Sequence, residues 1–252
     1  MTRKILILFS LMILPIITFS QDGWYLQNPT GEKFTLYHVF FSDPSNGWAV
    51  GENGKILHTN DGGVTWNQQN SGTETILFDV YFLNSTTGWA VGPGPRAGNG
   101  IILNTTDGGQ TWITQINIEN ALWEVHFTDE NYGWTAGQGN IIYSTDDGGK
   151  SWSEVEIDSS AGWVTGVFFS HPDTGWICTQ TPNLIFQTVD RGNSWTLQFE
   201  DTLTGRFFFN DLHFTDSQNG WVVGYPSIVL HTSDGGNTWT TQSVESEMLD
   251  LY

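Results

Sequence analysis

The sequence predicts an all-β fold assembled from repeated four-stranded units, and three observations carry this prediction. The 252 residues include 13 tryptophans and 29 glycines, while only 14% are charged. An eight-residue pattern, Thr-x-Asp-x-Gly-x-Thr/Ser-Trp, occurs five times, with its tryptophans 46, 40, 43 and 44 residues apart. Beyond the first twenty residues, no stretch shows a convincing helical period of apolar side chains. Repeats of about 40 to 50 residues with four strands each are typical of β-propeller blades.

Residues 1–20 differ in composition from the rest of the chain. Arg3 and Lys4 precede an apolar run that ends near Ser20. A charged start, an apolar middle and a small residue at the end are typical of a secretory signal peptide. A membrane anchor is the alternative, but it needs about twenty apolar residues, and this run is shorter. We therefore expect residues 21–252 to form an exported propeller, periplasmic, cell-surface or extracellular, with no membrane span after cleavage.

The first repeat shows how each unit is expected to divide into strands. Residues 36–41 are rich in aromatic side chains, and two further short strands are expected over 47–51 and 55–59, with a fourth from Thr65. Glycine and asparagine clusters separate them, as expected for tight turns. A second motif, Gly-Trp followed by small or β-branched residues, precedes each eight-residue pattern; its tryptophans are Trp48, Trp89, Trp134, Trp176 and Trp221. The paired motifs predict five complete blades.

The eight-residue pattern is expected to build a turn between the third and fourth strands. Its aspartate can accept backbone N–H groups, its glycine permits positive φ, and its tryptophan covers the hairpin. A calcium site is the alternative, but each turn offers too few carboxylates for a cation that takes about six to eight oxygen ligands. The residues assigned to this structural role are Asp61, Trp66, Asp107, Trp112, Asp146, Trp152, Asp190, Trp195, Asp234 and Trp239.

The Thr-x-Asp-x-Gly-x-Thr-Trp pattern resembles the Asp box, or BNR repeat, of sialidases and sortilin. The whole repeat, including Gly-Trp-Ala-Val-Gly, resembles the photosystem II stability and assembly factor family over about Trp24 to Gln242. The resemblance implies a seven-bladed, non-enzymatic assembly scaffold that meets its client through a basic, arginine-bearing surface. This chain departs from that surface. It has a formal net charge of −19, or −21 without residues 1–20, and three arginines beyond residue 20.

The first strand of each blade should line the central channel of a propeller. We align these strands on their central Val or Leu and compare the residues just before that position. Most of them are acidic, and we call the set the acidic column: His38, Asp79, Glu124, Gly166 and Asp211. The preceding column begins with three aromatic residues. The candidate binding residues at this channel mouth are therefore Tyr37, His38, Phe78, Asp79, Trp123, Glu124 and Asp211. Clustered carboxylates favour a bound cation or raised pKa values. In the alternative interpretation, they accept backbone N–H groups from the neighbouring blade and are structural.

The loop over residues 92–100 is longer than its counterparts in the other repeats, which suggests a contact element or a tolerated insertion. Arg96 in this loop and Arg206 are expected on the channel-mouth face. Cys178, the one cysteine, replaces a valine of the Gly-Trp motif, so we expect it to pack rather than react. No cofactor and no metal site is predicted.

A non-enzymatic scaffold that binds a protein partner is the function that these observations favour. The alternatives are glycan binding, by stacking on Tyr37, Phe78 and Trp123, and a sialidase-like glycoside hydrolase. Sialidases resemble one another in an arginine triad, whereas Arg191 is expected inside a turn on the opposite face from Arg96 and Arg206. The strongly acidic composition excludes nucleic acid as a partner, because phosphate binding needs clustered lysine and arginine.

Both ends of the propeller are expected to be partial. Residues 24–27 parallel the fourth strand of a blade, and residues 248–252 parallel the first strand of another. The strands that would complete that last blade are absent, so we expect a C-terminally incomplete propeller whose five blades do not close a ring.

Overall fold

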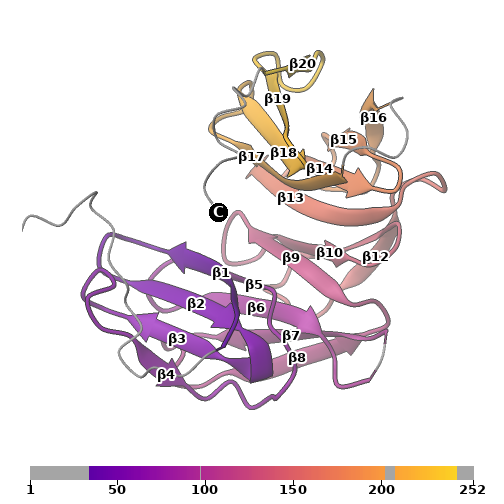
Figure 1. Ribbon diagram of the computed structural model, residues 1–252. Coiled ribbons are helices and arrows are strands. Elements are labelled where there is room, and N and C mark those ends of the chain that lie inside the picture. The colour runs from indigo at the N-terminus through magenta and orange to yellow at the C-terminus, as the bar shows by residue number, and fades with distance from the viewer. Residues whose placement is uncertain (1–33, 97, 202–207, 243–252) are drawn as a thin grey trace, which may run out of the picture. The chain divides into compact units, whose positions relative to one another are not determined.

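The computed structural model describes residues 34–96, 98–201 and 208–242 (Figure 1). These residues belong to one of two compact units of the chain, Lys33–Tyr252. They form five four-stranded antiparallel sheets, each built from four strands that are consecutive in the chain. The predicted all-β propeller of five complete blades is confirmed. The expected signal peptide and the partial strands over 24–27 and 248–252 lie outside the described residues.

The five blades follow one another along the chain. The first contains β1 (Leu36–Phe41), β2 (Gly47–Gly51), β3 (Ile56–Thr59) and β4 (Asn67–Gln69). The second contains β5 (Asp79–Phe82), β6 (Gly88–Pro93), β7 (Gly100–Thr105) and β8 (Ile113–Ile118). The third contains β9 (Leu122–Phe127), β10 (Gly133–Gly137), β11 (Ile141–Thr145) and β12 (Ser153–Glu156). The fourth contains β13 (Trp163–His171), β14 (Thr174–Gln180), β15 (Leu184–Thr188) and β16 (Thr196–Glu200). The fifth contains β17 (Phe208–Phe214), β18 (Gly220–Tyr225), β19 (Ile228–Thr232) and β20 (Thr240–Thr241).

The strand boundaries expected for the first blade agree with the structure except at the third and fourth strands. β3 begins one residue later than expected, after a three-residue 3-10 turn, η2 (Glu52–Gly54), and β4 begins two residues later than Thr65. The late start of β4 has a local cause, because the backbone N–H and the hydroxyl of Thr65 both donate to Asp61. Thr65 is therefore held in the turn rather than in the strand ladder.

Consecutive blades are joined by one repeated aromatic contact. The tryptophan of the Gly-Trp motif lies flat against a phenylalanine at or near the end of the first strand of the next blade. The four ring-centroid separations are 3.4, 3.5, 3.5 and 3.9 Å, for the pairs Trp48–Phe82, Trp89–Phe127, Trp134–Phe169 and Trp176–Phe214. These four tryptophans are at most 1% exposed. Each joint therefore buries two large apolar side chains between neighbouring sheets, the main source of stability in a repeat fold.

The eight-residue patterns form closed turns, which we call the aspartate turns: residues 59–66, 105–112, 145–152, 188–195 and 232–239. In the first, Thr59 Oγ1 donates to Asp61 and also accepts the Gly63 N–H, while Thr65 donates twice to the same carboxylate. Because three donors stabilise its charged form, the pKa of Asp61 falls to about 2. The structure supports the predicted structural role of this motif.

The assignment of Asp146 to the third aspartate turn is wrong. The hydrogen bonds of that turn go to Asp147, which accepts from Thr145 Oγ1 at 2.9 Å, from the Ser151 N–H at 2.9 Å and from the Ser151 hydroxyl at 2.7 Å. The physical reason is spacing, because only the residue two positions after the threonine can bring its carboxylate back over the turn. Asp146 is one position too early, and it is exposed.

Candidate functional site: the channel mouth

The first strands of all five blades line one cavity of about 390 Å³. β1, β5, β9, β13 and β17 each contribute side chains to it. Four of the five residues in the predicted acidic column are among its lining: His38, Asp79, Glu124 and Asp211. At the fifth position, a Cβ on Gly166 would lie 2.8 Å from the backbone nitrogen of Leu212. The glycine thus lets the fourth and fifth blades approach closely beside the cavity.

Asp79 is the most connected member of this column. Its Oδ1 lies 2.6 Å from Nδ1 of His38 on the first blade and accepts the Val80 N–H at 2.7 Å. Its Oδ2 accepts the N–H of Val125, on the third blade, at 2.8 Å. The side chain of Glu124 hydrogen-bonds to it as well. Asp79 therefore links three blades, and for this residue the structural interpretation of the acidic column is correct.

The remaining acidic groups are less satisfied. Within the described residues, the Asp211 side chain accepts a single hydrogen bond, from the N–H of Leu212 at 2.7 Å. Burial, followed by the charge of Asp79, raises the pKa of Asp211. Burial also raises the pKa of Glu124 well above its usual range, with further contributions from the charges of Asp79 and Asp211. Glu124 is thus stabilised in its protonated form, in which it can donate a hydrogen bond to Asp79.

His38 supplies the cationic counterpart of this cluster. Burial opposes its charged form, but the hydrogen bond and the negative charge of Asp79 prevail and raise its pKa. Its side chain is 44% exposed, whereas that of Asp79 is 6% exposed. The mouth can therefore offer a partner one accessible imidazolium and the carboxyl groups of Glu124 and Asp211. Among the described residues, no three His, Cys, Asp or Glu side chains are arranged to hold a metal ion.

A second row of aromatic side chains lines the same cavity, two residues further along each first strand. Neighbouring rings lie 4.9, 5.1, 5.0 and 4.9 Å apart, in the order Phe40, Tyr81, His126, Phe168 and His213. Burial lowers the pKa of His126 to about 4, so its imidazole is neutral at physiological pH; its Nε2 lies 2.9 Å from the carbonyl oxygen of Phe169. The sequence analysis missed this row, although the same alignment, read two residues on, contains it, because alternate residues of a strand share a face.

The predicted aromatic residues of the mouth form two pairs rather than one row. Tyr37 and Phe78 meet edge to face with centroids 5.1 Å apart. Trp123 pairs with Trp163, which the sequence analysis did not select, at 5.4 Å. Tyr37 is 44% and Trp163 is 47% exposed. Gly162-Trp163-Val164 has the sequence of the Gly-Trp motif, but it lies outside the five repeated positions of that motif, and this was the available signal for a different role.

Arg96 and Cys178 are not among the residues that line this cavity. Arg96 is exposed in the β6–β7 loop, where its carbonyl oxygen accepts the Asn99 N–H at 3.0 Å, and Arg206 lies outside the described residues. Cys178 is fully buried in β14, and burial raises the pKa of its thiol, as expected for a packing role. In the part of the chain that the structure describes, no helix is long and apolar enough to cross a bilayer.

Five repeated blades, aspartate turns and a shared channel define the class of this protein as a repeat-built β-propeller. The model of the photosynthesis system II assembly factor YCF48 family matches it over residues 18–113, 68–162, 113–206 and 161–249, and the chain belongs to that family. The photosystem II assembly lipoprotein Ycf48 of Synechococcus sp. (strain CC9902) is 34% identical over 82 residues, which cover 31% of this chain and 24% of that protein. The matched part of the chain thus spans about a quarter of that curated relative.

Solved structures share the fold at lower identity. A structure described as YCF48 bound to D1 peptide is 20% identical, with a TM-score of 0.59 over 88% of this chain and 85% of the other. The GH74 enzyme of Niastella koreensis is 17% identical, with a TM-score of 0.65 over 82% of this chain and 38% of the enzyme. At these identities the likeness concerns the fold alone.

Proposed function

We propose that this chain is an exported, non-enzymatic scaffold that binds a protein partner at the channel mouth. The observation that carries the proposal is the combination of exposed aromatic rings with acidic groups beside one cavity. Tyr37 and Trp163 offer apolar surface, and aromatic residues are enriched in the energetically dominant parts of protein interfaces. Family membership supports the proposal, since a family structure is described as YCF48 bound to D1 peptide.

The charge of the chain defines the kind of segment that fits this mouth. A formal net charge of −19 would steer a positively charged partner toward the protein and repel an acidic one. Glu124 and Asp211 provide acceptors for a lysine or arginine side chain, and Tyr37 provides a face for its aliphatic part. We therefore propose a basic peptide segment as the bound element.

The geometry of the carboxyl groups supports binding rather than glycoside hydrolysis. The two carboxyl groups of a glycosidase lie about 5 to 9.5 Å apart, so that substrate or water fits between them. Here Glu124 and Asp79 hydrogen-bond to each other, and both oxygens of Asp79 also accept backbone N–H groups. Glycan binding remains the second candidate at this mouth, because exposed rings such as Tyr37 and Trp163 can also stack on sugars.

Export is part of the proposal. It rests on the composition of residues 1–20, and it is compatible with a curated relative that is described as a lipoprotein. Expression of the full chain in a bacterial host, followed by cell fractionation and N-terminal sequencing, tests it. We expect a mature form that begins at Gln21 and lies outside the cytoplasm; an uncleaved cytoplasmic product would contradict export.

Binding of synthetic peptides of graded charge to the full chain tests the site. Basic peptides should bind, and Y37A/W163A should weaken binding by about tenfold or more, since aromatic hot spots contribute strongly. The matched control is Ile113→Ala, at a 68% exposed apolar residue of β8 away from the mouth, which should leave binding unchanged. Equal binding by Y37A/W163A would exclude the channel mouth as the site.

A further inference from the structure

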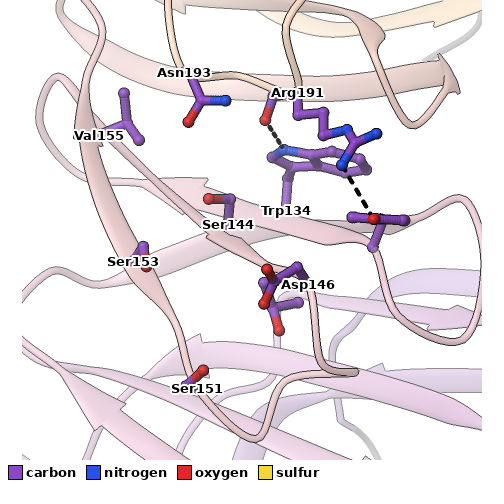
Figure 2. Close-up of a pocket in the computed structure, with 10 residues that line it drawn as sticks. Trp134, Ser144, Asp146, Ser151, Ser153, Val155, Arg191 and Asn193 are labelled. Atoms are coloured by element: carbon purple, nitrogen blue, oxygen red, sulfur yellow. Dashed lines mark hydrogen bonds between the residues drawn. The ribbon is translucent and has the colours of Figure 1, made fainter.

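We propose a second binding site, for a neutral sugar of monosaccharide size, in a polar cavity between the third and fourth blades. The cavity has a volume of about 260 Å³ and lies beside the aspartate turns of these blades (Figure 2). Its lining includes Tyr132, Ser144, Asp146, Ser153, Val155 and Arg191. None of these residues belongs to the channel mouth, so this inference goes beyond the proposed function.

The cavity exists because this joint lacks the side chains that fill the other joints. Gln69, Gln115 and Gln187 each donate an amide N–H to the carbonyl oxygen of the following blade's aspartate turn, at 2.8, 3.0 and 3.1 Å. In the repeat, Val155 stands where Gln69 and Gln115 stand, and Ser144 stands where Gln187 stands. Neither side chain is long enough to reach across, and a hollow is left.

A larger, charged residue, Arg191, stands at the rim of the same joint. Arg191 has a φ of 68°, at the position that Gly62, Gly108, Gly148 and Gly235 occupy in the other turns. An L-residue rarely adopts this conformation, and such departures are concentrated at functional sites. Like Gly108, Gly148 and Gly235, Arg191 still offers its carbonyl oxygen to the joint, where it accepts the Trp134 indole N–H at 2.9 Å.

The guanidinium group of Arg191 is held in place and its charge is matched. Its Nε donates to Asp173 Oδ1 at 2.6 Å, and its Nη1 donates to the Tyr132 hydroxyl at 3.1 Å. Figure 2 shows this side chain beside Trp134 at the edge of the cavity, with Asp146 on the opposite side. With Arg191 neutralised by Asp173, the unmatched charge at the cavity is the negative one of Asp146, so an anionic ligand is disfavoured.

Several lining groups lack a partner among the described residues. The structure gives no hydrogen bond to the side chains of Ser144, Ser153 or Asp146, whereas the neighbouring Asp147 is engaged by its own turn. Serine hydroxyls both donate and accept, and a carboxylate can accept several donors. Sugar hydroxyls also do both, and the methyl groups of Val155 can contact the C–H face of a pyranose. The chemistry of the lining therefore matches a neutral polyol.

Saturation-transfer NMR and calorimetry on the full chain, with glucose, galactose, mannose, xylose and N-acetylglucosamine as probes, test this inference. At least one sugar should bind with a Kd below about 1 mM. D146A should weaken that binding by about tenfold or more, because it removes hydrogen bonds to a charged group. The matched control is T106A, at the same position of the second aspartate turn, which should bind as the unmodified chain does.

A cavity-filling variant makes the test independent of the charge of Asp146. S144Q/V155Q restores the residue types present at equivalent positions of the other blades and should abolish binding while the melting temperature is retained. If this variant melts early, the single variant V155Q takes its place, with the same expectation. The inference is overturned if no sugar of the panel binds, if the filled variant binds as well as the unmodified chain, or if acetate competes more strongly than any sugar.

Discussion

Thr145 and Asp147 show how much of this fold depends on single polar residues. The threonine hydroxyl donates to the aspartate and accepts the Gly149 N–H, so one side chain connects the carboxylate of the turn to a backbone N–H of the same turn. Because backbone groups in a tight turn have few other partners, the aspartate is a structural element of each hairpin. Asp146, one residue earlier, contributes nothing to this network.

Substitution of the two neighbouring aspartates should separate these roles. We expect Asp147→Asn to lower the melting temperature at pH 7 and Asp146→Asn to leave it unchanged. The pKa of Asp147 is lowered to about 2 by its hydrogen bonds, so its contribution is present above the unfolded-state pKa, near 4, and is lost as the pH falls toward 2. Thermal unfolding between pH 7 and pH 2 should show the two curves converging in acid; an equal effect of both substitutions would contradict the assignment.

Glu124 should show the opposite pH dependence. Its pKa is raised by burial and by the neighbouring carboxylates, so its protonated form stabilises the fold at low pH, and this contribution is lost as the pH rises through the folded-state pKa. Glu124→Gln cannot ionise, and we therefore expect it to remove the loss of stability on the alkaline side. Melting temperatures from pH 5 to pH 9 check this, with Glu154→Gln, an exposed residue on β12, as the control.

At the scale of the elements, the joint between two blades is the repeated unit of stability. In the second to fifth blades, a phenylalanine at or near the end of the first strand contacts the face of the preceding blade's Gly-Trp tryptophan and the edge of its own turn tryptophan. Phe169, for example, lies 3.5 Å from Trp134 and 6.0 Å from Trp195, measured between ring centroids. The fifth blade differs, because Trp221 is only half-buried and tilts against His231 of its own blade.

Replacement of a Gly-Trp tryptophan should therefore lower the free energy of unfolding far more in an inner blade than in the last blade. We expect Trp134→Ala to lower the free energy of unfolding by about 3 to 5 kcal/mol, as for other fully buried aromatic residues. Trp221→Ala should cost less than half as much, since Trp221 packs against no phenylalanine of a following blade among the described residues. Chemical denaturation measures both values, and equal costs would show that the stacked phenylalanine contributes little.

At the scale of the whole molecule, family membership and the arrangement of charges favour binding over catalysis. Three arginines remain beyond residue 20, and Arg191 among them is paired with Asp173. Of the described arginines, neither Arg96 nor Arg191 lines the channel-mouth cavity, so these two do not contribute there to an arginine triad of the kind by which sialidases resemble one another. The expectation of an incomplete ring stays a prediction, because the strands on which it depends, 24–27 and 248–252, lie outside the described residues.

The full chain should hydrolyse neither sialosides nor xyloglucan-type glycans. We expect no turnover at an enzyme-like rate, above about 1 per second, because Asp79 is hydrogen-bonded to Glu124 and to two backbone N–H groups. Incubation with chromogenic sialosides and with xyloglucan, followed by product analysis, checks this. Hydrolysis that disappears in D79N or E124Q would replace the scaffold proposal by an enzymatic one.

The repeat, the number of blades and the acidic column could be predicted from sequence. Their signals are local, because turn glycines and paired tryptophans recur at a spacing that one blade imposes. Strand alternation then placed His38, Asp79, Glu124 and Asp211 at one level of the channel, where the structure has them.

Only the tertiary structure decided which groups satisfy one another. That Asp79 accepts the N–H of Val125, that Trp163 pairs with Trp123, and that Ser144 and Val155 leave a hollow under Arg191 all depend on contacts between blades some 40 residues apart. A sequence pattern identifies which residues stand at equivalent positions. Whether two of them meet depends on side-chain length and on the rotation between neighbouring sheets, and these are properties of the packed molecule.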